Sequence, residues 1–369
     1  MKCHLYAPHR VGCRRGRGFI QSLQALLVLF AASVAAQGAT LVNVDLTGFA
    51  SGGGAVGEGF VVSGDGQLVA FSSSGTNHVA GDTNNLSDIF VRDWARRSNV
   101  WDTTYSLAPI TGGLISVPLD FTPDGRFLLF ISRATNLVSG VFYPEKISQL
   151  FVRDLSSNVT ALVTVSANSL AAGKNTPLTG QGGLGDPHIT PDGRFVAFVS
   201  SDTNFVSLSD TNLGPDLFCR DMVSGVTELI SVSLDGTSAL PNQTFPYCMS
   251  TNGRYFAFET ASPVVVSGLT NTNRFSTQVY WRDRVTGANA AVSITVDGTF
   301  PQNPPSLKDM SSDGRYVCFW TGATNMVPNQ NDQNGTLDLF IRDMQLGETW
   351  LVTRATNGLT TGSRNSGGR

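Results

Sequence analysis

Two short motifs recur five times along the 369-residue chain, always in the same order. The first is a turn followed by an apolar run, as in Pro191-Asp192-Gly193-Arg194 before Phe195–Val199, and the second is a strand-like run that ends in Arg-Asp about 30 residues later. A period of roughly sixty residues with strand-like contents indicates an array with one supersecondary unit per repeat. The five copies end at Arg92-Asp93, Arg153-Asp154, Arg220-Asp221, Arg282-Asp283 and Arg342-Asp343.

Each repeat offers four strand candidates, which are clearest in the third repeat. A first strand near His188–Thr190 is reversed by the Pro-Asp-Gly turn, where Pro presets the backbone angle and Gly accepts a positive one. The second strand is predicted at Phe195–Val199, the third at Asp216–Asp221 and the fourth at Glu228–Ser233. Four antiparallel strands of this length make one small twisted sheet.

The predicted sheet is apolar on both faces. One position of the second strand is always Phe, and the residue before it is Ala in three repeats, Leu in one and Cys in one. Neither face can be left in water, so we expect the sheets to stack face to face around an axis as the blades of a β-propeller. A β-sandwich would need buried and polar residues to alternate, which these strands lack. The expected fold class is therefore all-β, a β-propeller of four-stranded antiparallel blades. The phenylalanine that recurs at the same position of each repeat is Phe71, Phe130, Phe198, Phe258 or Phe319.

The Pro-Asp-Gly-Arg turn with Phe-Val-Ala-Phe after it, and the later Asp-Leu-Phe, resemble the TolB-type, WD40-like β-propeller repeat of bacterial exported proteins. The resemblance covers nearly all of residues 41–360, and it is specific for fold rather than for function. Propellers with this repeat serve as interaction platforms, as gating domains beside proteases and as parts of surface proteins. The resemblance therefore implies one of several roles.

The first 38 residues differ in kind from the rest. A basic segment precedes an apolar run from Leu23 to Ala36, and small residues follow at Ala36 and Gly38. This pattern predicts a signal peptide at 1–38 and an exported protein that is periplasmic, extracellular or at the cell surface. The alternative is an uncleaved leader, which would be the only attachment to a membrane. We expect the propeller domain to occupy residues 39–361.

Counting strand candidates exposes an imbalance. Candidates for a fourth strand occur six times, and the other three strands occur five times. The extra candidate is Thr40–Leu46. We expect an incomplete sixth blade, either because the chain is a fragment or because the ring stays open, and residues 362–369 would be an unstructured tail or the start of the missing blade. A closed five-bladed ring with Leu41–Leu46 as a spare edge strand is the alternative.

Three of the five cysteines follow the predicted leader. Cys219 and Cys318 occupy strand positions that hold aliphatic residues in most other repeats, so we expect both to be small core residues. A disulfide between Cys219 and Cys248 is possible in an oxidising compartment, but nothing in the repeat demands it.

Three repeats carry the same spacing of oxygen ligands in the loop before the third strand. An Asp-x-Asn with a third carboxylate four residues on can wrap Ca²⁺ if backbone carbonyls complete the shell. The alternative is an Asx-turn in which these side chains bond to the backbone and cap the strand. Calcium is therefore a candidate cofactor. The candidate ligands are Asp82, Asn84 and Asp88; Asp210, Asn212 and Asp216; and Asp332, Asn334 and Asp338.

A second set of polar residues falls on the first strand of each repeat, four residues before the turn aspartate or Asn252. Mixed Asp, His and Cys side chains there could hold a transition metal near the central channel. Polar residues that face channel water or bond between blades explain the pattern equally well. The positions are Val61, Asp120, His188, Cys248 and Asp309.

The recurring arginine of the Arg-Asp pair is predicted to be structural, because a catalytic group would be unique rather than fivefold. We expect it to bridge neighbouring blades or to hold turn carbonyls. His78 lies in a loop position held elsewhere by Leu137, Phe205 and Met326. No nucleophile elbow, phosphate loop or His-Glu-x-x-His helix is present.

These observations favour an exported, non-enzymatic binding or scaffold module that uses its long-loop surface to bind a protein or a cell-envelope glycan. The net charge of −3 gives no broad basic field, so we expect no nucleic acid partner. The alternative is a hydrolase or lyase with a polar or metal site in the central channel, built from Asp120, His188 and Asp309.

Overall fold

The computed structural model describes residues 53, 56–79, 82, 86–93, 98–102, 116–144, 147–168, 171–174, 186–210, 212, 214–273, 275–330 and 336–354. All of them belong to one compact unit of the chain, Val42–Arg369. The predicted leader at 1–38, the strand candidate Thr40–Leu46 and the tail at 362–369 lie outside the described residues. The expected sixth blade therefore stays a prediction.

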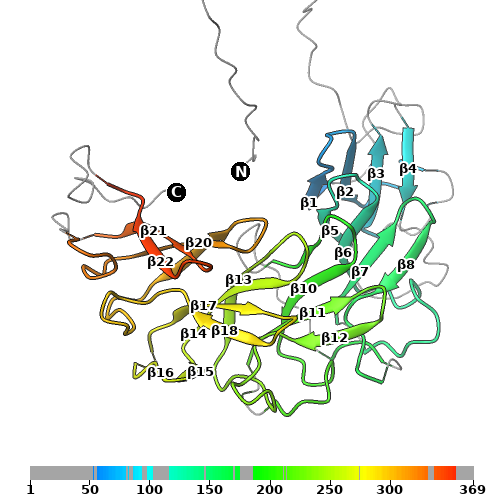
Figure 1. Ribbon diagram of the computed structural model, residues 1–369. Coiled ribbons are helices and arrows are strands. Elements are labelled where there is room, and N and C mark those ends of the chain that lie inside the picture. Colours follow the sequence, from blue (N-terminus) through cyan, green and yellow to red (C-terminus); the bar gives the residue numbers. More distant parts are fainter. Residues whose placement is uncertain are drawn as a thin grey trace, which may run out of the picture. The chain divides into compact units, whose positions relative to one another are not determined.

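The described residues form five four-stranded antiparallel sheets in which neighbouring strands follow chain order (Figure 1). Each sequence repeat makes one sheet, which confirms the predicted repeat unit and the all-β fold class. The first sheet contains β1 (Val56–Val62), β2 (Leu68–Ser73), β3 (Asp88–Asp93) and β4 (Ser98–Asp102). The second contains β5 (Ser116–Phe121), β6 (Phe127–Ser132), β7 (Gln149–Asp154) and β8 (Val159–Leu162).

The third sheet contains β9 (His188–Ile189), β10 (Phe195–Ser200), β11 (Asp216–Asp221) and β12 (Val226–Leu229). The fourth contains β13 (Thr244–Met249), β14 (Tyr255–Thr260), β17 (Gln278–Asp283) and β18 (Ala288–Ala291), with a small hairpin of β15 (Val264–Val266) and β16 (Leu269–Thr270) between its second and third strands. The fifth contains β19 (Ser306–Met310), β20 (Tyr316–Thr321), β21 (Asp338–Asp343) and β22 (Glu348–Leu351). Within this part of the chain no helix is long and apolar enough to cross a membrane.

The fourth strand of the third sheet differs from its prediction. It was expected at Glu228–Ser233, but β12 spans Val226–Leu229. The ladder ends there because the amides of Ile230 and Ser231 both donate to the carbonyl of Leu217, at 2.8 and 3.3 Å, so two residues oppose one. The chain then turns into a short hairpin in which Val232 faces Ala239.

The Asp-Gly turn has the local structure that its residues predict. In the third sheet the Gly193 amide donates to the Thr190 carbonyl at 2.8 Å, and Gly193 has a φ of +73°. The Asp192 carboxylate accepts the Thr190 hydroxyl at 2.6 Å and the Arg194 amide at 3.0 Å. The turn is thus closed by its own side chains before any neighbouring sheet contributes.

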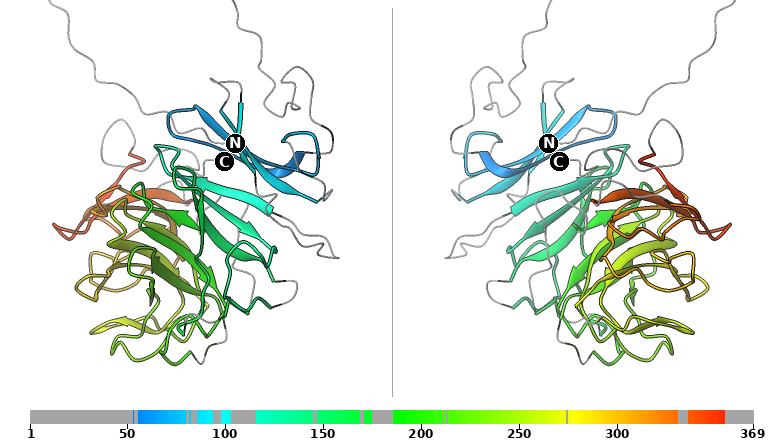
Figure 2. Two further views of the ribbon diagram at one scale, coloured as in Figure 1. Left: turned by 90° about the vertical axis from the view of Figure 1, so that its right-hand side faces the viewer. Right: turned by 90° about the vertical axis from the view of Figure 1, so that its left-hand side faces the viewer.

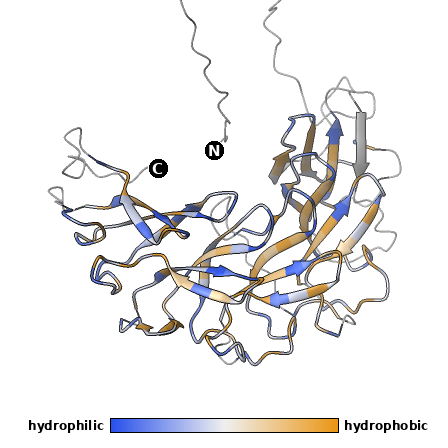
Figure 3. Ribbon diagram, viewed as in Figure 1, coloured by the Kyte–Doolittle hydropathy of each residue, from blue (hydrophilic) through white to orange (hydrophobic). Residues whose placement is uncertain are grey.

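The hydrophobic core lies between the sheets and not within any one of them. Four clusters of buried side chains each combine residues from two consecutive sheets. Between the second and third sheets, for example, Leu129 and Val152 pack with Val196, Phe198 and Phe218. Apolar residues consequently lie on both faces of a sheet, and much of the strand ribbon is coloured as hydrophobic in Figure 3. This arrangement confirms the two-sided apolar sheet that the sequence predicted.

The sheets follow one another along the chain (Figures 1 and 2), and each has two distinct faces. We call the face that meets the next sheet the trailing face and the opposite one the leading face. In the third sheet the trailing face carries Phe195, Ala197 and Cys219, and the leading face carries Val196 and Phe198.

The turn glycine of one sheet is placed directly against the trailing face of the sheet before it. A Cβ built on Gly193 would lie 2.3 Å from the ring of Phe127, the residue that follows the turn arginine of the second sheet. Gly193 is therefore required twice, for its positive φ and for this close approach. The same contact recurs between Gly125 and Leu68, Gly253 and Phe195, and Gly314 and Tyr255.

The three cysteines of the sheets are all free thiols. Cys219 and Cys248 are buried and Cys318 is half-buried, and Cys219 and Cys318 occupy the strand positions predicted for core residues. The disulfide between Cys219 and Cys248 that the sequence would allow is not formed. Burial raises the pKa of the Cys219 thiol to about 12, which keeps it protonated and unreactive.

Candidate functional site

The long connections all lie at one end of the sheets. In antiparallel strands joined in chain order, the connection between the first and second strands and the connection between the third and fourth lie at the same end of the sheet. The connection between the second and third strands lies at the other end, together with the connection to the next sheet. The surface formed by these long connections is called the long-loop face below. Its loops between the second and third strands span 74–87, 133–148, 201–215, 261–277 and 322–337.

In the first, third and fifth sheets this loop is anchored to the sheet by an inward side chain. Phe205 and Met326 are fully buried, and His78 takes the same place in the first sheet. The Nε2 atom of His78 lies 3.0 Å from Ser73 Oγ, and its ring packs against Phe90 with 4.6 Å between ring centroids. The sequence-based assignment of His78 to the loop position of Phe205 and Met326 agrees with this placement, and it gives His78 a packing role.

Large apolar side chains stand exposed on the long-loop face. Phe142 is 70% exposed and Phe275 is 84% exposed, each on a loop between the second and third strands of its sheet. The backbone under Phe142 is nevertheless fixed, because its carbonyl accepts the Ala172 amide at 2.8 Å. Exposed aromatic groups on a held backbone are typical of binding surfaces.

Two further apolar tips, Leu234 and Val296, sit on short turns that follow the fourth strands. Both side chains are about half exposed. Under Leu234 the Ser233 hydroxyl donates to Asp235 at 2.6 Å, and the turn closes at Gly236 with a φ of +73°. Sequence reasoning missed these tips, although a second Asp-Gly pair at Asp235-Gly236 and at Asp297-Gly298 could have indicated them.

The calcium candidates are brought together in the third sheet. The Asn212 amide nitrogen donates to Asp216 Oδ2 at 3.2 Å, and the Asn212 backbone amide donates to Asp210 Oδ1 at 3.1 Å. The Ser231 hydroxyl donates to Asp216 Oδ1 at 2.7 Å. The backbone bond to Asp210 is the kind that the Asx-turn alternative expects, whereas the other two bonds join side chains. Asp210 Oδ2 is buried with no hydrogen-bond partner.

The other two copies of this pattern are described only in part. Asp82 and Asp88 are buried in the first sheet, and buried Asp338 accepts the Thr353 hydroxyl at 2.9 Å in the fifth. Asn84, Asp332 and Asn334 lie outside the described residues. In the part of the chain that is described, no three His, Cys, Asp or Glu side chains gather closely enough to hold a metal ion.

The sheets without the pattern place a neutral residue where the others have the buried aspartate. Gln149 and Gln278 begin the third strands of the second and fourth sheets, and each accepts a hydroxyl hydrogen bond, from Thr164 at 2.6 Å and from Ser293 at 3.1 Å. Asp216 holds this position in the third sheet, where burial, together with the nearby Asp210 carboxylate, raises its pKa to about 7. The position therefore favours an uncharged group or a carboxylate neutralised by a proton or a cation.

The polar residues of the first strands form two separate groups. His188 Nδ1 lies 3.6 Å from Asp120 Oδ2 across the second and third sheets, and both side chains are partly exposed. Asp309 belongs to the other group, where burial and the Asp309 charge raise the pKa values of the Cys248 and Cys318 thiols. Protonated thiols are poor metal ligands. Of the three candidates for a channel site, the structure brings Asp120 and His188 together.

The fivefold arginine bonds within its own sheet. Arg220 Nη1 donates to Thr227 Oγ1 at 2.9 Å; a threonine hydroxyl likewise accepts from Arg153 and from Arg342, whereas Asn289 Oδ1 accepts from Arg282. The hydrogen bond from Arg282 to the Gly287 carbonyl is the expected bond to a turn. Arg220 also lines a pocket of about 220 Å³ with Ser166 and Phe205.

A second arginine, which follows the turn glycine in the second to fifth sheets, makes a strong ion pair within its own sheet. Arg254 and Asp283 form two parallel hydrogen bonds, at 2.9 Å from Nε and 2.7 Å from Nη2. The guanidinium also lies over the Tyr255 ring, 4.9 Å from its centroid. The equivalent pairs are Arg126 with Asp154, Arg194 with Asp221 and Arg315 with Asp343.

Four-stranded antiparallel sheets that share their cores with the sheets before and after them define the blades of a β-propeller. No protein-family model and no curated protein matches the chain. Solved structures that it is similar to include TolB from Acinetobacter baumannii, at 17% identity and a TM-score of 0.36, covering 80% of this chain and 53% of that one.

Two further similar structures belong to the same broad class. A putative TolB from Agrobacterium tumefaciens is 14% identical with a TM-score of 0.38, and covers 81% of this chain and 80% of that one. Dipeptidyl peptidase 4 from Porphyromonas gingivalis is 12% identical with a TM-score of 0.44, and covers 85% of this chain and 41% of that one. This chain spans about half the length of the Acinetobacter protein, and likeness at this level does not extend to activity, ligand or partner.

Proposed function

We propose that the protein is an exported, non-enzymatic β-propeller that acts as a binding or scaffold module through its long-loop face. The observation that supports this proposal best is the row of exposed apolar tips at Phe142, Leu234, Phe275 and Val296, each on a loop or turn of that face. Their backbone is held before any partner arrives, so little conformational entropy would be lost on binding.

The chemistry of these tips favours a protein partner over a cell-envelope glycan. Aromatic and aliphatic anchors gain most when they enter an apolar pocket of a second protein. A glycan could stack on Phe142 or Phe275, but it would gain little from Leu234 and Val296. Both partner classes remain arms of the experiment.

The test compares binding of the purified full chain to isolated envelope protein fractions and to peptidoglycan. We expect Phe142→Asp with Phe275→Asp to abolish binding to the protein fraction. Leu346→Asp is the control, because Leu346 is also largely exposed, at 60%, but lies on the short turn between β21 and β22, at the opposite end of its sheet. Equal binding by both variants, or binding to peptidoglycan alone, would contradict the proposed protein-binding face.

A second candidate function rests on the contact between Asp120 and His188. A carboxylate beside an imidazole can orient it as a general base, which a hydrolase or lyase in the channel would need. A screen of small ester and uronide substrates, with Asp120→Ala and His188→Ala as the variants, tests this candidate. Turnover that both variants remove would replace the binding proposal by an enzymatic one.

A further inference from the structure

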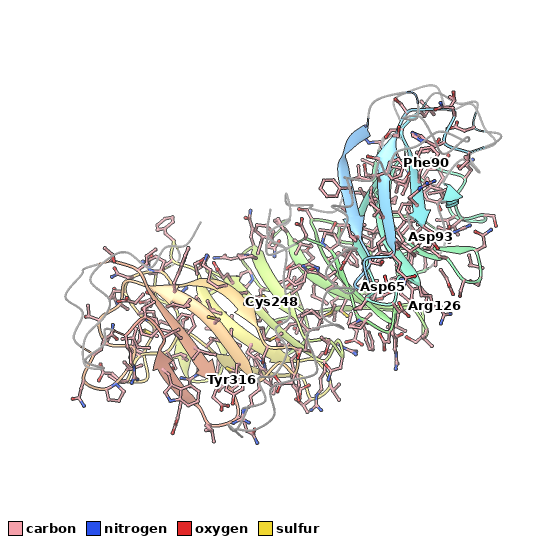
Figure 4. The ribbon with its side chains drawn as sticks, turned by 90° about the horizontal axis from the view of Figure 1, so that it is seen from above. Asp65, Phe90, Asp93, Arg126, Cys248 and Tyr316 are labelled. Carbon is pink, nitrogen blue, oxygen red and sulfur yellow. The ribbon has the colours of Figure 1, made fainter. Side chains whose placement is uncertain are left out.

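The turn arginines and the arginine of the third strand differ in how their charge is balanced. A turn arginine pairs with a carboxylate, as Arg126, labelled in Figure 4, does with Asp154. Arg220, on the third strand of the third sheet, donates to the Thr227 hydroxyl at 2.9 Å, and no carboxylate of the described residues lies within ion-pairing distance of it. Its half-buried guanidinium is therefore a positive charge without an anion in direct contact.

Arg220 lines a pocket of about 220 Å³ between the second and third sheets. The walls come from the residues after β8, from the loop between β10 and β11, and from the start of β12. A cavity of about 150 Å³ can hold benzene, so the pocket has room for a ligand of several heavy atoms. Its apolar residues include Phe205, Val206 and Val226, and its hydroxyl groups belong to Ser166, Ser207 and Thr227.

The second sheet shows what kind of atom such an arginine binds. Arg153 is the counterpart of Arg220, and its Nη2 donates to the side-chain oxygen of Asn158. In the third sheet Gly225 holds the position of Asn158 and lines the pocket. A Cβ built on Gly225 would lie 3.9 Å from Arg220 Nη2, with no other described heavy atom within 4 Å. The glycine thus leaves this nitrogen open to an oxygen atom from a ligand.

The fourth sheet supplies acceptors to its arginine from the protein itself. Arg282 Nη1 donates to the Gly287 carbonyl at 3.2 Å and to Asn289 Oδ1 at 2.8 Å. Asn289 is held in turn by the carbonyl of Val265, a buried residue of the small hairpin, at 3.1 Å. The Nε atoms of Arg220 and Arg282 are both buried without an acceptor, so that feature belongs to the repeat. The open Nη2 beside a pocket is what distinguishes Arg220 from Arg282.

We propose that this pocket binds the carboxylate of a small organic acid. One carboxylate oxygen accepts a hydrogen bond from Arg220 Nη2, in the place that the Asn158 oxygen takes in the second sheet. The Thr227 oxygen already accepts from Arg220 Nη1, and its hydroxyl hydrogen, which has no acceptor in the described part of the chain, is donated to the ligand. The hydrocarbon part of the acid lies against Val206 and the other apolar residues of the pocket.

The charge of the pocket favours an acid with a single negative charge. One guanidinium balances one carboxylate, and the neighbouring Asp221 is already paired with Arg194. A dianionic phosphate would bring an excess negative charge close to Asp221. Burial lowers the pKa of the Arg220 guanidinium, which still stays protonated at neutral pH, and a bound anion would offset this effect. None of the exposed apolar tips lines the pocket, so the site is independent of the proposed protein-binding face.

The test is a ligand-observed NMR titration of the full chain at constant ionic strength. The probes are butyrate, its neutral analogue butyramide, and inorganic phosphate. We expect saturable binding of butyrate, and binding of butyramide that is weaker by about tenfold or more, because a hydrogen bond to a charged group contributes at least that factor. Phosphate should also bind more weakly than butyrate. Absence of saturable butyrate binding, equal binding of butyramide, or tighter binding of phosphate would overturn the proposal.

The variant Gly225→Asn places the protein's own side-chain oxygen beside Arg220. Asparagine can adopt this backbone, since Asn158 has a φ of +60° and Gly225 one of +71°. We expect butyrate to bind about tenfold more weakly or worse, while the thermal midpoint of unfolding stays at least as high as that of the unaltered protein.

Gly347→Asn is the matched control. A Cβ built on Gly347 also lies 3.9 Å from an arginine Nη2, that of Arg342 in the fifth sheet, but Pro328 stands there at the loop position of Ser207. This variant should bind butyrate as the unaltered protein does. Butyrate binding that Gly225→Asn leaves intact, or that both variants weaken equally, would contradict a site at Arg220.

A second pair of variants tests the hydroxyl donor. Thr227→Val keeps the shape of the side chain and removes its hydroxyl, so it should weaken butyrate binding. Thr349→Val is its control, because Thr349 accepts from Arg342 at 2.8 Å as Thr227 accepts from Arg220. Circular dichroism establishes that each variant is folded. The same butyrate affinity for both variants would show that Thr227 does not contact the ligand and would refute the proposed binding mode.

Discussion

Arg284 of the fourth sheet donates a hydrogen bond to Glu228 of the third sheet, with 2.8 Å between Nη1 and Oε1. Its Nε donates to the Gly253 carbonyl at 2.9 Å, and its guanidinium lies over the Phe195 ring, 4.2 Å from the centroid. The arginine side chain is 13% exposed, whereas that of Glu228 is 40% exposed. One side chain therefore ties a turn, an aromatic ring and a neighbouring sheet together.

We expect Arg284→Ala to lower the free energy of unfolding by about 2 kcal/mol, because it removes two charge-assisted hydrogen bonds and leaves the Gly253 carbonyl short of a donor. Glu228→Ala should cost less than about 1 kcal/mol, since its side chain is 40% exposed and solvent screens its charge. Urea unfolding of both variants, followed by tryptophan fluorescence, measures the difference. Equal losses would mean that the ion pair, and not the arginine's other contacts, carries the effect.

Gly193→Ala should be among the most damaging single substitutions in the chain. The positive φ alone costs an alanine about 1 to 3 kcal/mol, and the clash with Phe127 adds a similar amount. Gly236→Ala is the matched control, because Gly236 also has a φ of +73° but no heavy atom lies within 4 Å of its Cβ position. Thermal unfolding of the pair isolates the contribution of contact between sheets. The same midpoint for both variants would contradict the close approach.

Asp216→Gln should stabilise the protein at neutral and higher pH in the presence of a chelator. The carboxyl pKa is raised to about 7, mainly by burial, and so lies above its unfolded value near 4. Such a group contributes its full stability below pH 4 and loses it as the pH rises from about 4 to 7. Glutamine removes that loss, as Gln149 and Gln278 do in the second and fourth sheets. The gain at pH 8 should be on the order of 2 kcal/mol, and a variant that is less stable than the parent at pH 8 would refute this account.

Calcium binding to the loops of the first, third and fifth sheets stays a prediction of the sequence. Calorimetric titration of chelator-treated protein with Ca²⁺ should release heat, and Ca²⁺ should raise the thermal midpoint of unfolding. Asp216→Gln should remove the part of this heat that comes from the third sheet. A titration without heat and without thermal stabilisation would leave the Asx-turn as the sole role of Asp210 and Asn212.

Acid should weaken the protein through the ion pairs of the turn arginines. The Arg254 guanidinium holds the pKa of Asp283 down at about 2, below its unfolded value near 4. A depressed carboxyl pKa gives stability that is present above pH 4 and is lost as the pH falls from about 4 to 2. Arg254→Gln, which copies Gln67 of the first sheet, should flatten the profile in this window and leave it unchanged above pH 5. If the variant loses as much stability between pH 4 and 2 as the unaltered protein, the ion pair contributes nothing to stability.

Much of the fold follows from the sequence because its signals are local and repeated. Asp192-Gly193 specifies a turn through its own side chain and its positive φ, and Phe195–Ser200 is apolar on both faces, so the sheets had to stack. The end of β12 at Leu229 could not be foreseen, since it depends on which carbonyl accepts two amides. Nor could the sequence show that Asp221 pairs with Arg194 and not with the adjacent Arg220, because this pairing depends on side-chain reach across neighbouring strands.

The candidate site was less accessible to sequence reasoning for a physical reason. Long polar loops indicate a surface, but the exposure of Phe142 and Phe275 depends on how each loop folds back over its sheet. The pairing of Asp120 with His188, and the separation of Asp309 from both, likewise follow from the spacing between sheets. Spacing along the chain carries no such information.

Because each core cluster combines residues from two sheets, the contacts that keep a sheet folded depend on its neighbours. A substitution that disrupts one interface between sheets should destabilise the two sheets that form it and leave the more distant sheets folded. We therefore expect the chain to unfold in steps. Proteases should then cut first in the first and fifth sheets, and the resulting fragments should be whole repeats.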